Sequence, residues 1–372
     1  MNFPNARIRT YHGLRALWVS VILCVATATS AWAATDVELY KDQEVISQNA
    51  NQEEQDEAIR SAFERVLKRV TGRQDVVDDP ALIDALENGS RYLSTFRFEA
   101  SDEFFTNILG EQIPTKTMML EFDDTAVNSL LIEYQLPVWG SRRPEVLVWL
   151  ADRSQDREHI VSDADSGPIV ATFDRLSSRL GLPYILPIMD LTDTLNMEFP
   201  NLYGLFSEDI EKASSRYTAE AVLAGRLDRQ GSRYKADWLI LFKGMRIPIE
   251  TAEGSRLEVI NAGLAAMAEQ LSDQYAYLSD GSDASNIQVQ VVDVHSAKTF
   301  ADIDRYLGSV NLITQSTLAE IAEDKVTFNV MVSGTQQQLA DLLSLDRKLA
   351  PELELTLEEQ LDSTLVYRWI AY

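Results

Sequence analysis

The sequence predicts an α+β protein in which a signal peptide precedes three modules of mixed helix and strand. Three observations support this prediction. Residues 1–33 have a basic start, a short apolar run and small residues at their end. Helical and strand periodicities then follow one another along residues 35–278. Residues 287–372 show strand and helix patterns in the order β-α-β-β-α-β.

The first 33 residues predict export. Arg7, Arg9 and Arg15 precede an apolar run from Ala16 to Ala28, and Ala31-Trp32-Ala33 places small residues where signal peptidase cleaves. The run is too short to span a membrane, so we expect cleavage after Ala33; a retained anchor is the alternative. No later segment approaches about 18 consecutive apolar residues, so no transmembrane segment is expected in the mature chain.

The amino-acid composition limits the classes of molecule that the protein is expected to bind. Without the leader, the chain has 30 Lys and Arg against 58 Asp and Glu, a formal charge of −28. This charge disfavours nucleic acid and anionic lipid, because proteins bind both by neutralising phosphate with Lys and Arg. The one cysteine, Cys24, lies in the leader, so the mature protein should contain no disulfide and no thiolate site.

The first module is expected over residues 35–143. Its best helix covers residues 54–71, where the apolar side chains share one face and Gly72 can end the helix in the left-handed conformation. The other predicted elements are a short helix begun by Asp79 and Pro80, half-buried strands at 92–98 and 118–122, and a helix capped by Asp123 or Asp124.

The second module is expected over residues 144–278. Residues 145–151 are apolar without alternation, as in a strand that is covered on both faces. The elements that follow are a helix at 168–180 ended by Gly181, an irregular strand at 182–189, a helix at 207–217, a hairpin of 221–227 with 234–242, and a helix at 255–275. This order indicates a sheet covered by helices.

A polar, glycine-containing segment at residues 279–286 is the expected linker to the third module. The predicted strands of residues 287–372 are 287–294, 310–318, 325–332 and 364–371, and the predicted helices are 298–307 and 336–343. The order β-α-β-β-α-β is that of the ferredoxin-like arrangement. The acidic stretch 350–362 is inserted before the last strand.

Sequence motifs for catalysis are largely missing. The chain has no G-x-S-x-G, H-E-x-x-H or Walker motif. His159 or His295 could act as a base, although a surface histidine without a partner motif is the simpler interpretation. Ser232 and Lys235 match S-x-x-K, but they fall in a predicted hairpin rather than at the start of a helix. We therefore expect no catalytic residue, no cofactor and no metal site.

Two places are candidates for binding. Trp139, Arg142 and Arg143 combine an aromatic and two basic side chains, which is the composition of a protein-binding hot spot. Alternatively, Trp139 packs the junction between the first two modules while the arginines pair with acids there. Asp190 follows the strand at 182–189, where ligands of open sheets gather, but it could instead cap a turn or a helix.

Several stretches suggest a family. They are Arg69–Gly72, Leu136–Pro144 with its Leu-Pro-Val-Trp-Gly start, Gly181–Pro183 with Pro187 and Asp190, and Ala221–Leu227. With the leader, residues 35–277 resemble a bacterial envelope family catalogued as domain of unknown function 2066. The resemblance implies a periplasmic location and no catalytic residue. The second module is also similar to the N-terminal domain of TolB, and the first two modules are similar to FlgT; both are assembly or docking parts of the periplasm.

These features predict a soluble periplasmic protein that is not an enzyme and that binds or assembles other proteins of the cell envelope. One alternative is a carboxylate-based hydrolase of envelope polymers, which would need two acids facing each other across a cleft. Another is a sensor that binds a small ligand at the end of the second module's sheet.

Overall fold

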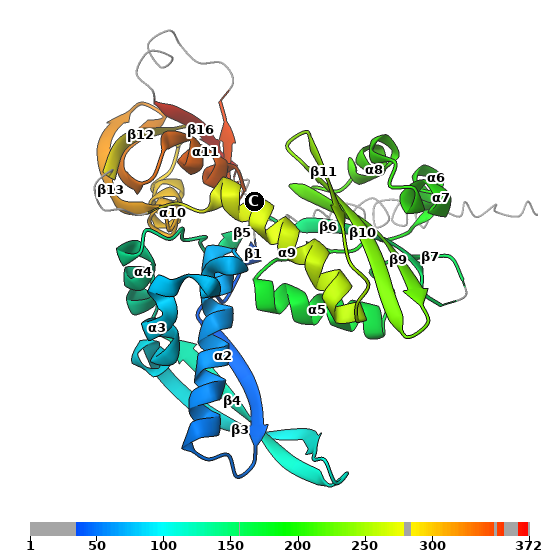
Figure 1. Cartoon of the computed structure of the whole chain (residues 1–372). Helices are drawn as coiled ribbons and strands as arrows, with labels where there is room; N and C mark the ends of the chain where they lie inside the picture. The colour runs from blue at the N-terminus through cyan, green and yellow to red at the C-terminus, as the bar shows by residue number, and fades with distance from the viewer. Residues whose placement is uncertain (1–34, 156, 279–283, 346–347, 353–363, 371–372) are drawn as a thin grey trace, which may run out of the picture. The chain divides into compact units, whose positions relative to one another are not determined.

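A computed structural model describes residues 35–155, 157–278, 284–345, 348–352 and 364–370. The predicted signal peptide (1–33), most of the predicted linker and most of the acidic stretch 350–362 lie outside these residues. Within them the chain is a mixed α+β protein, as predicted, with a three-, a six- and a five-stranded sheet and a two-stranded ribbon (Figure 1). None of the described helices is long and apolar enough to cross a membrane.

The first module is an antiparallel sheet in the order β2-β4-β3, covered on one face by helix α2 (Figure 1). Its elements are β1 (Thr35–Asp36), β2 (Lys41–Ser47), α2 (Gln52–Thr71), the 3-10 turns η1 (Asp75–Asp78), η2 (Pro80–Leu82) and η3 (Gly89–Tyr92), α3 (Ile83–Glu87), β3 (Leu93–Thr106), β4 (Gln112–Phe122), α4 (Asp124–Glu133) and β5 (Arg142–Arg143). Phe63 and Leu67 of α2 share a buried core with Met118 and Leu120 of β4. The apolar face predicted for α2 therefore holds the helix on the sheet.

The second module is a sheet in the order β11-β10-β9-β6-β7, with β8 beside β6. Its elements are β6 (Val146–Arg153), β7 (His159–Val161), α5 (Pro168–Leu180), β8 (Tyr184–Ile185), α6 (Leu191–Asn196), α7 (Phe199–Tyr203), α8 (Ser207–Ser214), β9 (Ala221–Gln230), β10 (Arg233–Phe242), β11 (Met245–Glu250) and α9 (Arg256–Tyr275). Val148 of β6 belongs to the core beneath α5 and α9, whereas Trp149 belongs to the core beneath α7 and α8. The prediction that β6 is covered on both faces is confirmed.

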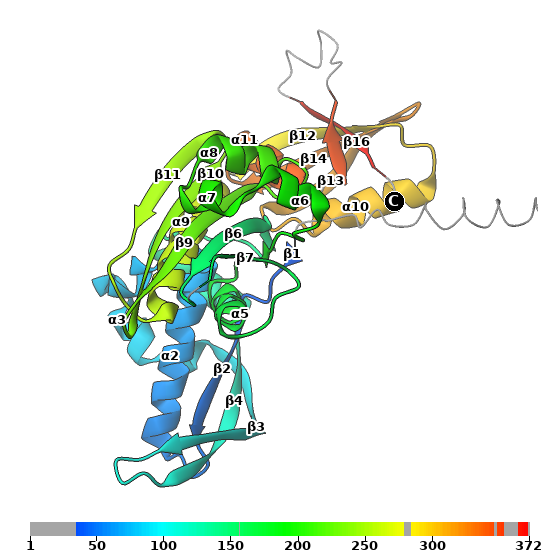
Figure 2. The same ribbon diagram turned by 90° about the vertical axis from the view of Figure 1, so that its right-hand side faces the viewer.

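The strand predicted at 182–189 is wrong in extent. Only Tyr184 and Ile185 pair with β6, because Pro183 and Pro187 have no N–H to donate to a neighbouring strand. The short strand β7 and the third strand of the meander, β11, were not predicted. Figure 2 shows β11 beside β10 at the edge of the sheet.

The third module has strand order β13-β14-β12-β16-β15. Its elements are β12 (Ala284–Val292), α10 (Ala297–Gly308), β13 (Ile313–Ala322), β14 (Lys325–Ser333), α11 (Gln336–Leu345), β15 (Leu349–Pro351) and β16 (Leu365–Trp369). In the β-α-β-β-α-β arrangement the last strand should run antiparallel to the first, since helical crossovers keep the strand direction and the hairpin reverses it. Here β16 runs parallel to β12, because the unpredicted strand β15 takes the expected direction and the chain then turns back.

Candidate functional site

The structure buries two of the three residues of the predicted hot spot. Trp139 and Arg143 are both 0 % exposed, and the Arg143 guanidinium carbon lies 3.8 Å from the centre of the Trp139 ring. Arg142 is half-buried, and its Nη2 donates to the Ser309 hydroxyl at 2.6 Å. Neither Trp139 nor Arg143 is therefore presented on the surface of the chain.

Arg143 is held by backbone carbonyls rather than by the acids that the sequence suggested. Its guanidinium donates to the carbonyl oxygens of Gly140 (3.1 Å), Trp139 (3.0 Å), Arg69 (2.5 Å), Leu180 (3.0 Å) and Gly181 (2.9 Å). The last three acceptors come from the C-terminal ends of α2 and α5. Carbonyls at a helix end have no partner within the helix and carry partial negative charge, so a buried cation between two such ends is stabilised.

Two further donors complete the end of α2. The backbone N–H of Trp139 donates to the Val70 carbonyl at 2.7 Å, and the Ser272 hydroxyl of α9 donates to the Thr71 carbonyl at 2.6 Å. Gly72 follows at a φ of 72°, and a Cβ there would lie 2.4 Å from Ser272 Cβ and 2.8 Å from Trp139 Cε3. Three successive carbonyls of α2 are thus bound by groups from the second module and the segment that leads into it.

The junction contains a second buried guanidinium. Arg69 is 4 % exposed, and its Nη2 lies 2.6 Å from Asp42 Oδ2. Burial lowers the pKa of Arg143 well below its usual value, and the nearby charge of Arg69 lowers this pKa further. Arginine is not deprotonated inside proteins, so both guanidinium groups are positively charged. The geometry supports the packing alternative for Trp139 and Arg143.

Asp190 begins a helix. It is the N-cap of α6, where its Oδ1 accepts from the N–H of Asp193 at 3.0 Å. Arg216 Nη1 lies 2.6 Å from the same carboxylate and 2.8 Å from that of the buried Asp193. The hydrogen bond from Arg216 and those from the helix N-terminus hold the pKa of Asp190 well below its usual value. This arrangement supports the capping alternative over a ligand site.

The contribution of the Asp190 charge to stability should appear in the pH dependence of the free energy of unfolding of an Asp190→Asn variant. Asparagine is also a good N-cap, so the substitution mainly removes the charge that pairs with Arg216. Because folding lowers the pKa of Asp190 from 3.8, the carboxylate stabilises the fold above about pH 4, and this contribution is lost as the pH falls through the lowered pKa. Urea unfolding should show a larger deficit of the variant at pH 7 than at pH 3. An equal deficit at both values would contradict the ion pair.

Exposed apolar side chains gather on the hairpin of β3 and β4. They are Phe96, Phe98, Phe104, Phe105, Ile108 and Leu109. Ile108 is 102 % exposed and Leu109 is 79 % exposed. The turn that carries them is held by Asn107, whose Oδ1 accepts from the N–H groups of Leu109 and Glu111 at 2.9 Å each. The tip therefore presents two aliphatic side chains on a fixed turn.

A bulge sets the direction of the outer half of this hairpin. The register between β3 and β4 shifts between Ala100 and Phe104, and the Thr115 hydroxyl donates to the Glu103 carbonyl within the bulge at 2.6 Å. Bulges bend a strand and increase its twist. Beyond this point the hairpin extends past the end of β2 and is not covered by α2 (Figures 1 and 2).

Sequence reasoning missed the hairpin tip. The predicted strands ended at residue 98 and resumed at residue 118, so the outer half of the hairpin was not assigned. A usable signal was present, because Asn107 and Gly110 lie between apolar residues, as in a hairpin turn. The Ser101-Asp102 interruption concealed the continuation of β3.

One group of described side chains has the composition of a metal site. Ligand atoms of Asp293, His295 and Asp324 all lie within 4.8 Å of one another. Carboxylate oxygens and an imidazole nitrogen are ligands that Zn²⁺ accepts. However, Arg368 Nη1 lies 3.1 Å from Asp293 Oδ2 and already neutralises that carboxylate. The group carries no metal assignment.

The other candidates for catalysis have local structural partners. His159 Nε2 lies 2.8 Å from Asp165 Oδ2, and the Ser162 hydroxyl donates to the same oxygen at 2.8 Å. Both groups thus contact the carboxylate rather than each other, unlike a serine and its general base. Ser232 lies in the turn between β9 and β10 and Lys235 lies in β10, as the predicted hairpin requires.

Comparison with known proteins corrects the expected family. Residues 33–140 match the model of a domain of unknown function (DUF8605), which is less than half of the chain. This is a different family from domain of unknown function 2066, and no similarity to TolB or FlgT is found. No curated protein matches the chain. The segment Ala221–Leu227 was part of the resemblance to the expected family. The glycine in it has a local structural reason, since a Cβ at Gly225 would lie 2.3 Å from Trp238 Cε3.

Proposed function

We propose that the mature protein is a binding or assembly component of the cell envelope, without enzymatic activity, and that the β3–β4 hairpin contacts its partner. The observation that carries this proposal is the fixed tip, where Ile108 and Leu109 are exposed. Apolar side chains gathered on one exposed element are typical of interaction sites. The residues that resemble the domain of unknown function include this hairpin.

The charge on the hairpin indicates the chemistry of its partner. Asp102, Glu103 and Glu111 are exposed on the outer half of the hairpin. On its inner half, by contrast, Glu99 pairs with Arg97, and Lys116 lies 4.3 Å from the centre of the Phe98 ring. The whole chain carries a net charge of −25, which disfavours an anionic lipid surface. The partner we propose is a protein with an apolar groove and a basic rim. Strand β3 is also an edge strand, so its outer backbone groups can pair with an extended segment of that protein.

Periplasmic location is part of the same proposal. It is supported by the basic, apolar and small-residue sequence of residues 1–33. For the third module we propose a variant of the ferredoxin-like arrangement in which β15 is an added edge strand. In this proposal the module supplies a further surface for assembly, although its fold alone does not fix a function.

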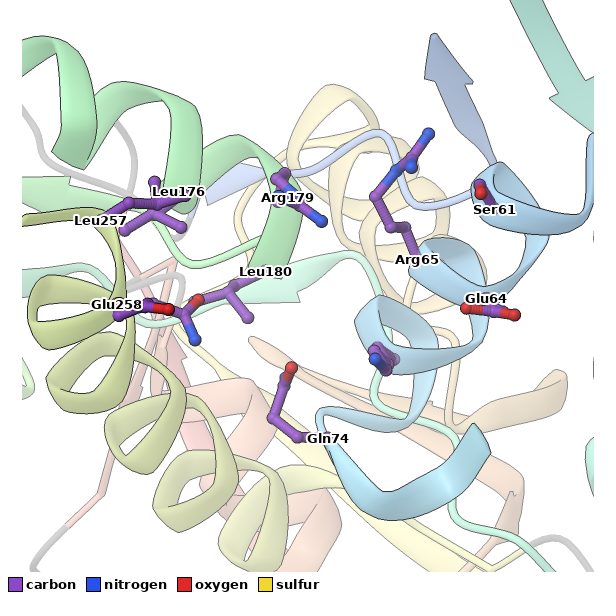
Figure 3. Close-up of a pocket in the computed structure, with 11 residues that line it drawn as sticks. Ser61, Glu64, Arg65, Gln74, Leu176, Arg179, Leu180, Leu257 and Glu258 are labelled. Atoms are coloured by element: carbon purple, nitrogen blue, oxygen red, sulfur yellow. The ribbon is translucent and has the colours of Figure 1, made fainter. Parts of the chain in front are cut away.

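The hydrolase alternative has less support. Glu64 of α2 and Glu258 of α9 both line a cavity between α2, α5 and α9 (Figure 3), so two acids do meet at one cavity. Glu258 Oε2 accepts from the Ser255 N–H at 2.7 Å as part of a capping box, which lowers the pKa of Glu258. A general acid needs a raised pKa, so this carboxylate is unsuited to the role.

Crosslinking in intact cells tests the proposal. A photoreactive residue at Ile108 or Leu109 should form the same adduct with another envelope protein, because both side chains would be buried in the interface. A probe at the exposed Lys235 of β10 serves as the control and should not form that adduct. Adducts formed equally from all three positions, or none from the tip of a normally expressed protein, would contradict a docking hairpin.

A further inference from the structure

We propose that the cavity between α2, α5 and α9 binds a small organic anion, whose acidic group contacts Lys68, Arg179 and Gln74. This site is separate from the hairpin. It develops the ligand-sensor alternative, but it places the ligand in this cavity rather than near Asp190. The cavity has a volume of about 360 Å³. Sites for small molecules begin at about 300 Å³, so one compact ligand would fit.

Two cations of the cavity make no direct hydrogen bond or ion pair among the described residues. Within the part of the chain that the structure describes, the side chains of Lys68 and Arg179 have no hydrogen-bond or ion-pair partner. The neighbouring Arg65 is different, because its Nη2 lies 2.8 Å from Asp42 Oδ1 and 2.5 Å from Glu44 Oε2. Arg179 is exposed on α5; partial desolvation and the charges of Arg65 and Arg175 lower its pKa, whereas the charges of Asp42 and Glu44 act in the opposite direction. The carboxylates of Glu64 and Glu258 line the same cavity, so its three basic side chains, Arg65, Lys68 and Arg179, outnumber its acidic ones by one.

A third donor is buried and unpaired. Gln74 Nε2 is inaccessible to solvent and has no hydrogen-bond partner. A buried donor without a partner is unfavourable, and rotation of the Gln74 amide toward the cavity would let an acceptor on a ligand pair with it. Gln74 follows the end of α2, and Figure 3 shows its side chain extending from there into the space before Arg179 and Leu180. An oxyanion at this point would meet donors from the first and second modules.

The remaining walls define the rest of the ligand. Leu176 and Leu180 of α5 and Leu257 of α9 line the cavity. A carboxylate or phosphate with a short apolar group would therefore fit better than an inorganic ion. Such a ligand would connect α2 to α5 and α9, as Arg143 connects α2 to α5 and Ser272 connects α2 to α9. Binding would add to the stability of the junction by mass action.

Calorimetric titration of the purified protein with benzoate and with phenyl phosphate tests this inference. At least one of these anions should bind with a dissociation constant below about 1 mM, and the preferred one shows whether the acidic group is a carboxylate or a phosphate. Arg179→Gln and Lys68→Gln should each weaken binding about tenfold, because each removes a charged donor. Benzyl alcohol, which lacks the charge, should not bind.

Arg175→Gln is the matched control, since Arg175 is exposed on the same helix and does not line the cavity. It should change the affinity by no more than about twofold. The unfolding midpoints of all three variants should remain that of the wild type, so weaker binding cannot be ascribed to loss of the fold. The absence of saturable heat with both anions would overturn the inference, and so would an equal loss of affinity in Arg175→Gln and Arg179→Gln.

Discussion

Replacing Arg143 by methionine should lower the free energy of unfolding by about 3–5 kcal/mol. Methionine fills much of the same volume but offers no donor to the five carbonyls that Arg143 binds. Four of these contacts are buried, so water would not readily replace the guanidinium. The ends of α2 and α5 would then face each other without the cation that lies between them.

Arg142→Met provides the control for this experiment. Arg142 is adjacent in sequence but half-buried, so its replacement should cost less than about 1 kcal/mol. Arg143→Lys should fall between the two, because one ammonium cannot reach the carbonyls of both helix ends. Urea unfolding followed by tryptophan fluorescence measures all three variants. A stability of Arg143→Met within about 1 kcal/mol of the wild type would show that the junction does not depend on this side chain.

Local signals in the sequence predicted much of the fold. The apolar face and Gly72 predicted the bounds of α2 to within two residues. Pro168 and Gly181 predicted both ends of α5, and Ser255 predicted the start of α9. These signals work because caps and periodicity act within a few residues. The continuous apolar run of β6 indicated burial on both faces for the same reason.

The features that depend on distant contacts could not be predicted in this way. The carbonyls that hold Arg143 lie up to 74 residues away in sequence, and a sequence displays side chains rather than the free backbone groups of helix ends. An acid was therefore the expected partner, and a carbonyl was the actual one. The direction of β16 was missed because a strand as short as β15 has no recognisable pattern.

The second large effect is expected at the hairpin tip. Replacing both Ile108 and Leu109 by serine should weaken binding to the partner found by crosslinking at least tenfold. In the wild-type complex each aliphatic side chain would be buried against the partner, and complete burial of such a side chain contributes about 1.5–3 kcal/mol to the free energy of binding. The free energy of unfolding should change by less than about 0.5 kcal/mol, since both side chains are exposed in the free protein.

A second pair of exposed leucines provides the matched control for the hairpin variant. Leu191 and Leu195 of α6 are each 75 % exposed, and replacing both by serine removes similar surface far along the sequence from the hairpin. The decisive measurement is the dissociation constant of the partner for the wild type and for the two double variants. The proposed function predicts at least a tenfold increase for Ile108→Ser with Leu109→Ser and no change for Leu191→Ser with Leu195→Ser. An unchanged constant for the hairpin variant, or an equal increase for both, would contradict it.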